Sequence, residues 1–274
     1  MSPAVWAGSK SRRLFATSKS TNMPERSMIA RACWCLSFLL LVTATAAGDD
    51  RPRYTIYRAA TPIVIDGRLD EPAWFGAPSV GPFRFAWWKS GKQEQTVAKI
   101  LWDDNYLYVA YLCQDEHISA KHKGHDTPVW NDDCVEVFAA PDSNRPETYF
   151  NIEMNANGAV FDAFHPHGPD SNWHSNWNAE GLRVATRING TLNNDSDRDD
   201  SWTLEVAIPF KAYAPAARHI PPKSGDVWRL NLNRCGGKAN EQFSQWAPGT
   251  EREPQFHTPR DFGFVTFSDK AVPF

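Results

Sequence analysis

The sequence predicts an all-β protein, a single antiparallel β-sandwich of the jelly-roll type with about ten strands. Short extended segments recur along the chain with turn residues between them, and apolar residues nowhere follow a sustained helical repeat. The segment "WDDNYLYVAYL" predicts a hairpin that turns at residues 103–105, and Asn157-Gly158 predicts a second hairpin. No linker or internal repeat divides these segments, so we expect one folded domain.

The expected strands are flanked by turn signals and are, in chain order, Ile63–Ile65, Val97–Trp102, Tyr106–Cys113, Cys134–Ala139, Tyr149–Asn155, Val160–Phe164, Leu182–Ile188, Trp202–Ile208, Trp228–Arg234, Phe243–Trp246 and Phe262–Phe267. Outside them, only the segment that begins at Phe210 is expected to form a helical turn, which Pro215 keeps short.

The composition is that of a globular protein with balanced charge. The chain has 274 residues, of which 42% are hydrophobic, and a formal net charge of −3. Because the charge is close to balance, nothing argues for a nucleic-acid or polyanion partner. Aromatic residues make up 13% of the chain and include 12 tryptophans. That content suits both a large sandwich core and a surface that stacks against flat ligands.

Residues 1–47 are interpreted as a signal peptide with an N-terminal extension, and residues 48–274 as the folded domain. Arginines precede the apolar run "CWCLSFLLLVTATAA", which ends in small residues at positions 44–46, as in a secretory signal. The run is short for a bilayer span. We predict cleavage near Ala46 or Ala47, with Met23 or Met28 as the true start. The product is then secreted or periplasmic, with no membrane attachment after cleavage.

Three cysteines remain in residues 48–274, namely Cys113, Cys134 and Cys235. An odd number allows at most one disulfide, and all three lie in apolar segments that are expected to be strands. We therefore expect buried, unpaired thiols and not a disulfide-stabilised scaffold.

One strand carries a carboxylate that its pattern does not explain. In "TPVWNDDCVEVFAA" side chains alternate between faces, so Val135 and Val137 share one face while Cys134, Glu136 and Phe138 share the other. Both faces are otherwise largely apolar, which predicts a strand buried on both sides. A buried carboxylate without a partner is costly, so Glu136 requires partners.

Two interpretations stay open for Glu136 and for Trp130, which lies just before the strand. Glu136 either contacts a ligand or forms a structural salt bridge with Arg229 or Arg234. Trp130 is followed by three polar residues that place it at a sheet end. It is therefore either a ligand contact or a core tryptophan at the strand entrance.

Six segments of the chain together resemble the family 9 carbohydrate-binding modules, which belong to the DOMON-like group of β-sandwiches. They occur in the order "IDGRLDEPAW", "WDDNYLYVAYLCQDE", "VWNDDCVEVF", "YFNIEMNANGAVFDAF", "WTLEVAIPF" and "FHTPRDFGFVTF", and cover nearly all of residues 48–274. The resemblance implies a β-sandwich that binds sugars, often the reducing end of a plant polysaccharide.

The resemblance also implies how the sugar is held, with two aromatic rings clamping it while polar side chains bind its hydroxyl groups. It assigns the first ring to Trp130, the acid to Glu136, polar contacts to Asn151 and Asn233, and the second ring to Phe256. Phe256 stands where the family has tryptophan, and the family's arginine-type contact corresponds to asparagine here.

Tryptophans in polar, loop-like surroundings are further candidates for the binding surface. Trp173 and Trp177 in "SNWHSNW", and the pair Trp87-Trp88, are less easily explained as core residues. Either pair is expected to be able to extend the aromatic surface of the site.

Metal binding is a separate expectation. The resemblance implies structural calcium held by loop carboxylates and carbonyls, and the candidate ligands are Asp66, Asp70, Asp115 and Asp132. The histidines of "HISAKHKGHD" and "HPH" lack a recognised zinc-ligand spacing and are interpreted as parts of solvated loops.

We therefore expect a secreted, non-catalytic protein that binds a mono-, oligo- or polysaccharide, alone or beside a separate glycan-degrading enzyme. One alternative is a glycoside-active enzyme that uses Glu136 with Asp132 or Asp133. Asp132 and Glu136 are four residues apart on one strand, about 13 Å by strand rise, which exceeds the separation used in hydrolysis.

A second alternative is a haem-binding electron carrier, because some DOMON-like domains hold haem. Its axial ligands would be Met154 together with His165 or His167. A visible absorption spectrum distinguishes this class from a sugar-binding protein.

Overall fold

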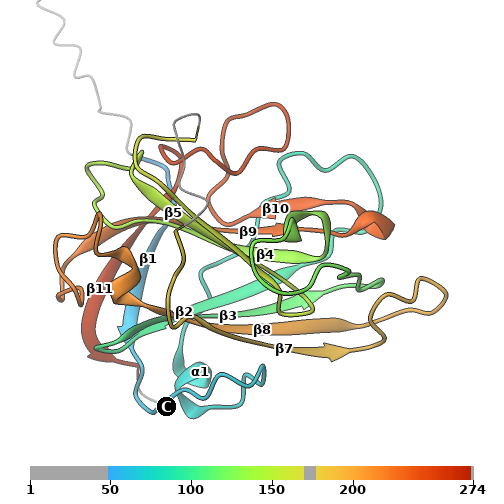
Figure 1. The fold of residues 1–274 in the computed structure, drawn as a ribbon, viewed down its shortest axis with the longest axis horizontal. Helices are drawn as coiled ribbons and strands as arrows, with labels where there is room; N and C mark the ends of the chain where they lie inside the picture. The colour runs from blue at the N-terminus through green and yellow to red at the C-terminus, as the bar shows by residue number, and fades with distance from the viewer. Residues whose placement is uncertain (1–48, 170–176, 273–274) are drawn as a thin grey trace, which may run out of the picture. The chain divides into compact units, whose positions relative to one another are not determined.

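A computed structural model describes residues 49–169 and 177–272 of the chain (Figure 1). The helices among these residues are short, and comprise α1 (Pro72–Gly76) and the 3-10 turns η1 (Val129–Asn131), η2 (Phe210–Tyr213) and η3 (Lys238–Asn240). None of the described helices is long and apolar enough to cross a membrane.

Eleven strands make up most of the regular structure in the described ranges. They are β1 (Arg53–Arg58), β2 (Thr96–Trp102), β3 (Tyr106–Gln114), β4 (Cys134–Ala140), β5 (Tyr149–Asn155), β6 (Val160–His165), β7 (Arg183–Asn189), β8 (Ser201–Pro209), β9 (Val227–Cys235), β10 (Phe243–Gln245) and β11 (Gly263–Ala271).

These strands form one continuous sheet in the order β6-β5-β4-β9-β11-β1-β2-β3-β8-β7, and β10 pairs with β9. Neighbouring strands are antiparallel except around β1, which lies parallel to both β11 and β2. In Figure 1, β5, β4 and β9 lie above β2, β3, β8 and β7, while β11 and β1 connect the two halves at the left. The sheet therefore curls into a sandwich, as the sequence predicts.

The main hydrophobic core lies between the two halves of the sheet. Val135 and Val137 of β4 share it with Val109 of β3 and Leu204 of β8, and all four are buried. Alternation along each strand sends every second side chain into this core. Removal of this apolar surface from water is the dominant favourable contribution to folding.

The outer face of β2, β3 and β8 is covered by the chain between β1 and β2. Trp74 of α1 and Ile63 lie in a second buried cluster with Leu101, Tyr108 and Ala207. This segment contains "IDGRLDEPAW", so its apolar residues close one outside face of the sandwich.

Two of the predicted hairpins are confirmed, and their turns are held by side-chain oxygens. Between β2 and β3, Asp103 Oδ1 accepts hydrogen bonds from the backbone N–H groups of Asn105 and Tyr106 at 2.7 and 2.8 Å. Between β5 and β6, Asn155 Oδ1 accepts from Asn157 and Ala159 at 3.1 and 2.8 Å. Such bonds are the reason Asn and Asp favour turns.

Three details of the sequence prediction are wrong. Residues Ile63–Ile65 form no strand, because Ile63 packs beside Trp74 over the outer face. Strand β1 was not expected, since it buries only Tyr54 and Ile56 and shows too short an alternation. Helix α1 has five residues, fewer than two turns, so it produces no apolar repeat.

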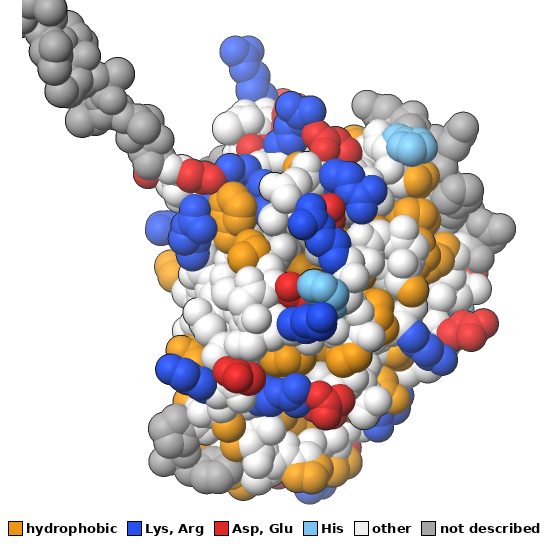
Figure 2. Space-filling model, turned by 90° about the vertical axis from the view of Figure 1, so that its left-hand side faces the viewer, with side chains coloured by type: hydrophobic (Ala, Val, Ile, Leu, Met, Phe, Trp, Pro, Cys, Tyr) orange, Lys and Arg blue, Asp and Glu red, His pale blue; other side chains and the backbone are white. Residues whose placement is uncertain are grey.

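The prediction for the cysteines is confirmed, because Cys113, Cys134 and Cys235 are all buried and unpaired. On the face of the molecule shown in Figure 2, basic and acidic side chains are interspersed with apolar and neutral ones. That mixture agrees with the nearly balanced net charge.

Candidate functional site

A cavity of about 580 Å³ lies on the outer face of the half-sheet formed by β6, β5, β4 and β9. Its lining comes from these strands, from η1, η3 and β10, and from residues 254–257, which precede β11. On β4, Val135 and Val137 enter the main core while Glu136 and Phe138 line the cavity. The alternation predicted for this strand is therefore confirmed, and it turns Glu136 outward from the sandwich.

Strand register brings the polar side chains of the cavity floor together. Glu136 lies directly opposite Glu153 on β5 and directly opposite Asn233 on β9. Phe161 on β6 lies opposite Glu153. Side chains of directly paired residues project from the same face about 5 Å apart. These four residues form one row across four strands, which we call the glutamate row.

Each glutamate of the row is held by an asparagine. Asn233 donates from Nδ2 to Glu136 Oε2 at 3.1 Å, and Asn151 donates from Nδ2 to Glu153 Oε1 at 2.8 Å. The Cys235 thiol also lies 3.5 Å from Glu136 Oε1. Glu136, Glu153, Asn151 and Cys235 line the cavity, whereas Asn233 is buried and orients Glu136.

The interpretation of Glu136 as a salt-bridge partner of Arg229 or Arg234 is wrong. Arg229 donates to the backbone oxygens of Phe262 and Arg260, and Arg234 pairs with Asp115 at 3.0 Å. Within the described part of the chain, no lysine, arginine or histidine forms an ion pair with either glutamate of the row.

Burial shifts both glutamates toward their protonated forms. Burial raises the pKa of Glu136 to about 7, and the hydrogen bond from Asn233 opposes that shift. Burial, followed by the charge of Glu136, raises the pKa of Glu153 well above its usual range. Each residue is at most 4% exposed and faces the other across the ladder. Since two adjacent carboxylates cannot both ionise cheaply, the pair shares a proton near neutral pH.

Two uncharged histidines flank the floor. Burial lowers the pKa of His165 to about 3 and that of His257 to about 4, so neither ring is protonated at neutral pH. His165 Nε2 lies 2.9 Å from Asn151 Oδ1, and its ring stacks on Tyr149 at 4.4 Å between centroids. The Tyr149 hydroxyl lies 2.7 Å from His257 Nδ1. These contacts fix Asn151, and through it Glu153.

The two predicted clamp rings both line the cavity but differ in exposure. Trp130 is 43% exposed and rests edge-on against Phe161, with centroids 5.1 Å apart and an interplanar angle of 82°. Phe256 is 7% exposed and packs against Trp87 at 5.7 Å and Phe243 at 6.2 Å. Trp130 therefore offers an aromatic surface to a ligand, whereas Phe256 is a buried part of the cavity wall.

Of the other tryptophans proposed for the surface, Trp87, Trp88 and Trp177 lie within the described residues, and none of these three lines the cavity. Trp177 packs against Phe150, at 4.8 Å between ring centroids, beside the main core of the sandwich. Trp173 lies outside the described residues. Trp87 packs against Phe256 and donates from Nε1 to the backbone oxygen of Glu251 at 2.9 Å. Trp88 is 42% exposed and does not line the cavity.

Sequence reasoning missed Glu153, Phe161, His165 and Phe243, all of which line the cavity. A signal was present for Glu153, because in "YFNIEMN" it lies two residues after Asn151 and must share its face. Phe161 and Phe243 lie in segments correctly expected to be strands, whereas His165, considered only as a haem ligand, directly follows an expected strand and ends β6. Only the register shows which of their neighbours carry the polar floor.

None of the candidate calcium ligands Asp66, Asp70, Asp115 and Asp132 belongs to a group of three or more possible ligands among the described residues. Asp115 pairs with Arg234, and Asp132 accepts hydrogen bonds from His122 and Asn155. The aspartate at 66 accepts from the backbone of Arg68. Structural calcium therefore stays a prediction without an assigned ligand set.

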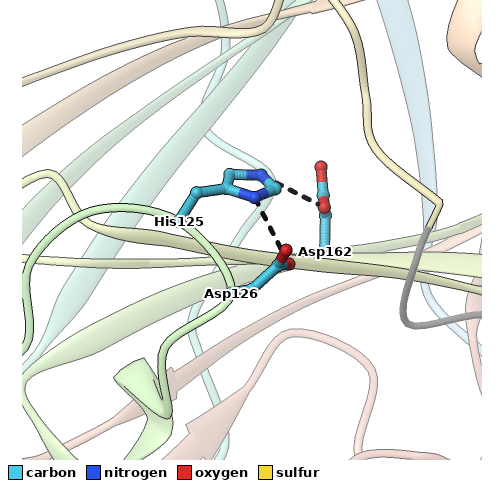
Figure 3. Close-up of side chains that lie close together, drawn as sticks. All are labelled: His125, Asp126 and Asp162. Carbon is cyan, nitrogen blue, oxygen red and sulfur yellow. Dashed lines mark ion pairs between the residues drawn. The ribbon is translucent and has the colours of Figure 1, made fainter.

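A different group has metal-ligand chemistry in the described part of the chain, consisting of His125, Asp126 and Asp162 (Figure 3). Its possible ligand atoms lie within 4.8 Å of one another. His125 contacts Asp126 through Nδ1 and Asp162 through Nε2, both at 3.3 Å. None of the three lines the cavity. Because both ring nitrogens already face carboxylates, the arrangement is a histidine bridging two aspartates.

Comparison with known proteins points to sugar recognition. The model of the family described as carbohydrate-binding family 9 matches residues 84–267. Among curated proteins, endo-1,4-β-xylanase A of Thermotoga maritima is 30% identical over 86 residues, which are 31% of this chain and 8% of the xylanase. The chain thus matches only a small part of that enzyme.

Solved structures share the fold at low sequence identity. A candidate carbohydrate-binding protein from Bacteroides uniformis is 20% identical, with a TM-score of 0.67 over 80% of this chain and 100% of that chain. A family 9 module from Caldicellulosiruptor kristjanssonii in complex with cellotriose is 17% identical, with a TM-score of 0.56 over 81% and 98%. Its complex with glucose is also 17% identical, with a TM-score of 0.54 over 80% and 98%.

Proposed function

Because the chain belongs to carbohydrate-binding family 9, we propose that it is a non-catalytic protein that binds a saccharide in the cavity over the glutamate row. We further propose that it is exported and then cleaved near Ala46 or Ala47. A module of the same family and fold holds glucose and cellotriose. A glucose-type ring, free or at the end of a glycan, is therefore the first ligand to test.

The exposed ring of Trp130 at the edge of a polar floor carries this proposal. A pyranose has a face of C–H groups and a rim of hydroxyl groups. The Trp130 ring can cover the face without requiring hydrogen bonds, while Glu136, Glu153 and Asn151 offer acceptors and donors to the rim.

The positions of the carboxylates favour binding over hydrolysis. Glycoside hydrolysis uses two carboxyl groups that flank the scissile bond from different sides. Glu136 and Glu153 project from one face of neighbouring strands. Asp132 and Asp133 do not line the cavity, and Asp133 accepts backbone hydrogen bonds from Ser119 and Gly237 at 2.7 Å each. This arrangement supports the assignment of the two glutamates as groups that bind hydroxyls.

The arrangement of Met154 and His165 argues against haem. Met154 is buried in the main core, whereas His165 lines the cavity on the opposite face of the half-sheet. Two axial ligands must approach one iron from its two sides. A pair of residues separated by a strand layer does not meet that requirement.

Trp130→Ala tests the proposed function. Titration calorimetry with glucose, cellobiose and cellotriose is expected to show at least about a tenfold loss of affinity in the variant, because a stacked aromatic contact and its apolar area are removed. The melting temperature should change little, since the Trp130 ring is about half exposed and contacts chiefly Phe161.

Trp88→Ala is the matched control. Trp88 is 42% exposed, nearly the same as Trp130, and does not line the cavity. Its removal is expected to leave affinity unchanged. Equal affinities for wild type and Trp130→Ala would overturn the assigned site, and the absence of binding to any saccharide by the wild type would overturn the function.

A further inference from the structure

The two glutamates of the row form a buried pair of acids without a cation. They lie directly opposite each other on β4 and β5, and each is at least 96% buried. No basic side chain in the described ranges pairs with either of them. Like charges directly opposite in a ladder are destabilising, and a buried charge normally has a partner. The described part of the chain therefore offers these acids no positive charge when they ionise.

One oxygen of the pair receives no hydrogen bond from the described residues. Glu153 Oε1 accepts from Asn151, but Glu153 Oε2 is buried and has no hydrogen-bond partner among the described residues. Glu153 lines the cavity, so a ligand that reaches the floor meets this side chain, whose buried oxygen the chain leaves without a donor. Buried acceptors in proteins are usually paired, and leaving one unpaired costs free energy.

The surroundings of the pair suit a cation better than an anion. Aromatic rings of Trp130, Phe161, Phe243 and Phe256 line the same cavity, and the faces of such rings attract cations. The remaining titratable groups of the lining are the neutral rings of His165 and His257, the Cys235 thiol, and Lys238 with Glu241 in the exposed segment after β9. Lys238 and Glu241 have opposite charges, so the acidic character of the floor is not cancelled.

We propose that the natural ligand is an amino sugar with a free ammonium group, which the cavity binds by placing that group against Glu136 and the unpaired oxygen of Glu153. This inference rests on the proposed saccharide-binding function and specifies its ligand. An ammonium group donates up to three hydrogen bonds and accepts none. It therefore complements a floor of acceptors, and its charge removes the repulsion between the two carboxylates.

A neutral sugar meets the same floor at a disadvantage. A hydroxyl group supplies no charge, so one carboxyl group must stay protonated beside it. A charge-assisted hydrogen bond is roughly twice as strong as a neutral one. Burial raises the pKa of both acids, so an entering ammonium is also expected to displace the shared proton.

The experiment compares glucosamine, glucose and N-acetylglucosamine, which differ in the group on one ring carbon. Titration calorimetry is run at roughly pH 6.5, where a sugar amine is protonated. Glucosamine is expected to bind at least about tenfold more tightly than the two neutral sugars. Repeating the titration in two buffers of different ionisation enthalpy should show proton release with glucosamine and none with glucose.

Glu153→Gln isolates the charge of the pair. The substitution keeps the size of the side chain and an acceptor for Asn151, and it is expected to lower the ratio of the glucosamine to glucose affinities at least about fivefold. Glu180→Gln removes one negative charge from an exposed glutamate outside the cavity and should leave that ratio unchanged.

The outcomes separate the ligand class from the general function. Equal or weaker binding of glucosamine than of glucose would overturn the inference and leave saccharide binding intact. An equal drop of the affinity ratio in Glu153→Gln and Glu180→Gln would also overturn it, because the effect would then reflect net charge alone. A wild type that binds none of the three sugars would overturn both proposals.

Discussion

The two outer faces of the sandwich each bury a glutamate, but only one face leaves it open to a ligand. On the half-sheet of β3 and β8, Glu205 is fully buried and burial raises its pKa to about 7. On the half-sheet of β4 and β5, burial likewise raises the pKa of Glu136 to about 7. The two sites have the same titratable group and the same main cause of its shift.

The difference lies in what covers each face. Glu205 Oε2 accepts from the backbone N–H groups of Asp66 and Gly67 at 3.1 and 2.8 Å, and Oε1 accepts from the Trp74 indole at 2.8 Å. Gly67 has φ +82°, and a Cβ there would lie 2.7 Å from the Thr186 backbone, so only glycine brings this loop close enough. The protein itself supplies every donor that Glu205 needs.

The glutamate row lacks such a cover. Its donors are two asparagines and a thiol, all of them neutral, and one oxygen of Glu153 has no partner among the described residues. A cavity lies over these glutamates, whereas a loop covers Glu205. A raised pKa alone therefore does not identify a binding site. The useful criterion is whether the donors around a buried acid come from the chain or are left for a ligand.

Removal of Glu205 is expected to have the largest effect on stability. Glu205→Ala leaves the indole N–H of Trp74 and the N–H groups of Asp66 and Gly67 without their acceptor, beneath a packed loop. We expect a loss of about 3 kcal/mol in the free energy of unfolding at pH 7, after allowance for relief of the buried charge. Urea denaturation followed by tryptophan fluorescence measures it.

Glu153→Ala is the counterpart on the other face. Among the described residues only Asn151 donates a hydrogen bond to Glu153, and water can enter the cavity beside it, so the free energy of unfolding should change by less than about 1 kcal/mol. If both alanine variants lose the same stability, the distinction between a structural acid and a ligand-facing acid is wrong.

Glu153→Gln is expected to change the free energy of unfolding by less than Glu205→Ala does, and to raise it instead of lowering it. The folded-state pKa of Glu153 is raised above its unfolded value, so the folded protein retains a proton that the unfolded chain releases. The contribution of this group to stability is therefore largest below the usual glutamate pKa and falls as pH rises through the folded-state pKa. Glutamine does not ionise, so the variant avoids that loss.

The pH dependence of the free energy of unfolding tests whether the variant gains stability as the pH rises. Between about pH 5 and pH 8, Glu153→Gln should gain stability relative to wild type, reaching about 1 kcal/mol at the upper end. A gain at low pH that disappears at high pH would contradict the raised pKa. Glu180→Gln, at an exposed position, should follow the wild-type curve.

Local pattern was sufficient to predict how Glu136 lies in its strand. Alternation assigns Val135 and Val137 to one face and Glu136 to the other, and the structure places the valines in the core and the glutamate at the cavity. The family resemblance also selected Asn233, which holds Glu136. These predictions succeed because the period of a strand is a local property.

The partners across strands could not be predicted in the same way. That Glu153 faces Glu136 depends on the register between β4 and β5, which the connecting residues 141–148 set. Trp177 shows the same limit, since its polar neighbours suggested a surface role although its ring packs on Phe150. Tertiary contacts between distant segments decide both cases.

The smallest expected effect concerns two thiols that lie on different sides of the half-sheets. Cys113 is enclosed in the main core, whereas Cys235 lines the cavity beside Glu136. Burial raises the pKa of Cys113 to about 12 and that of Cys235 well above its usual range, so both react slowly.

A small methanethiosulfonate reagent should nevertheless modify Cys235 before Cys113, because only Cys235 borders a space that the reagent can enter. A saturating sugar should slow the modification of Cys235 several-fold and leave Cys113 unaffected, as peptide mass spectrometry would show. Modification of Cys113 first would contradict the access to Cys235 through the cavity, and no protection of Cys235 by a bound sugar would mean that the ligand does not occupy the cavity over the glutamate row.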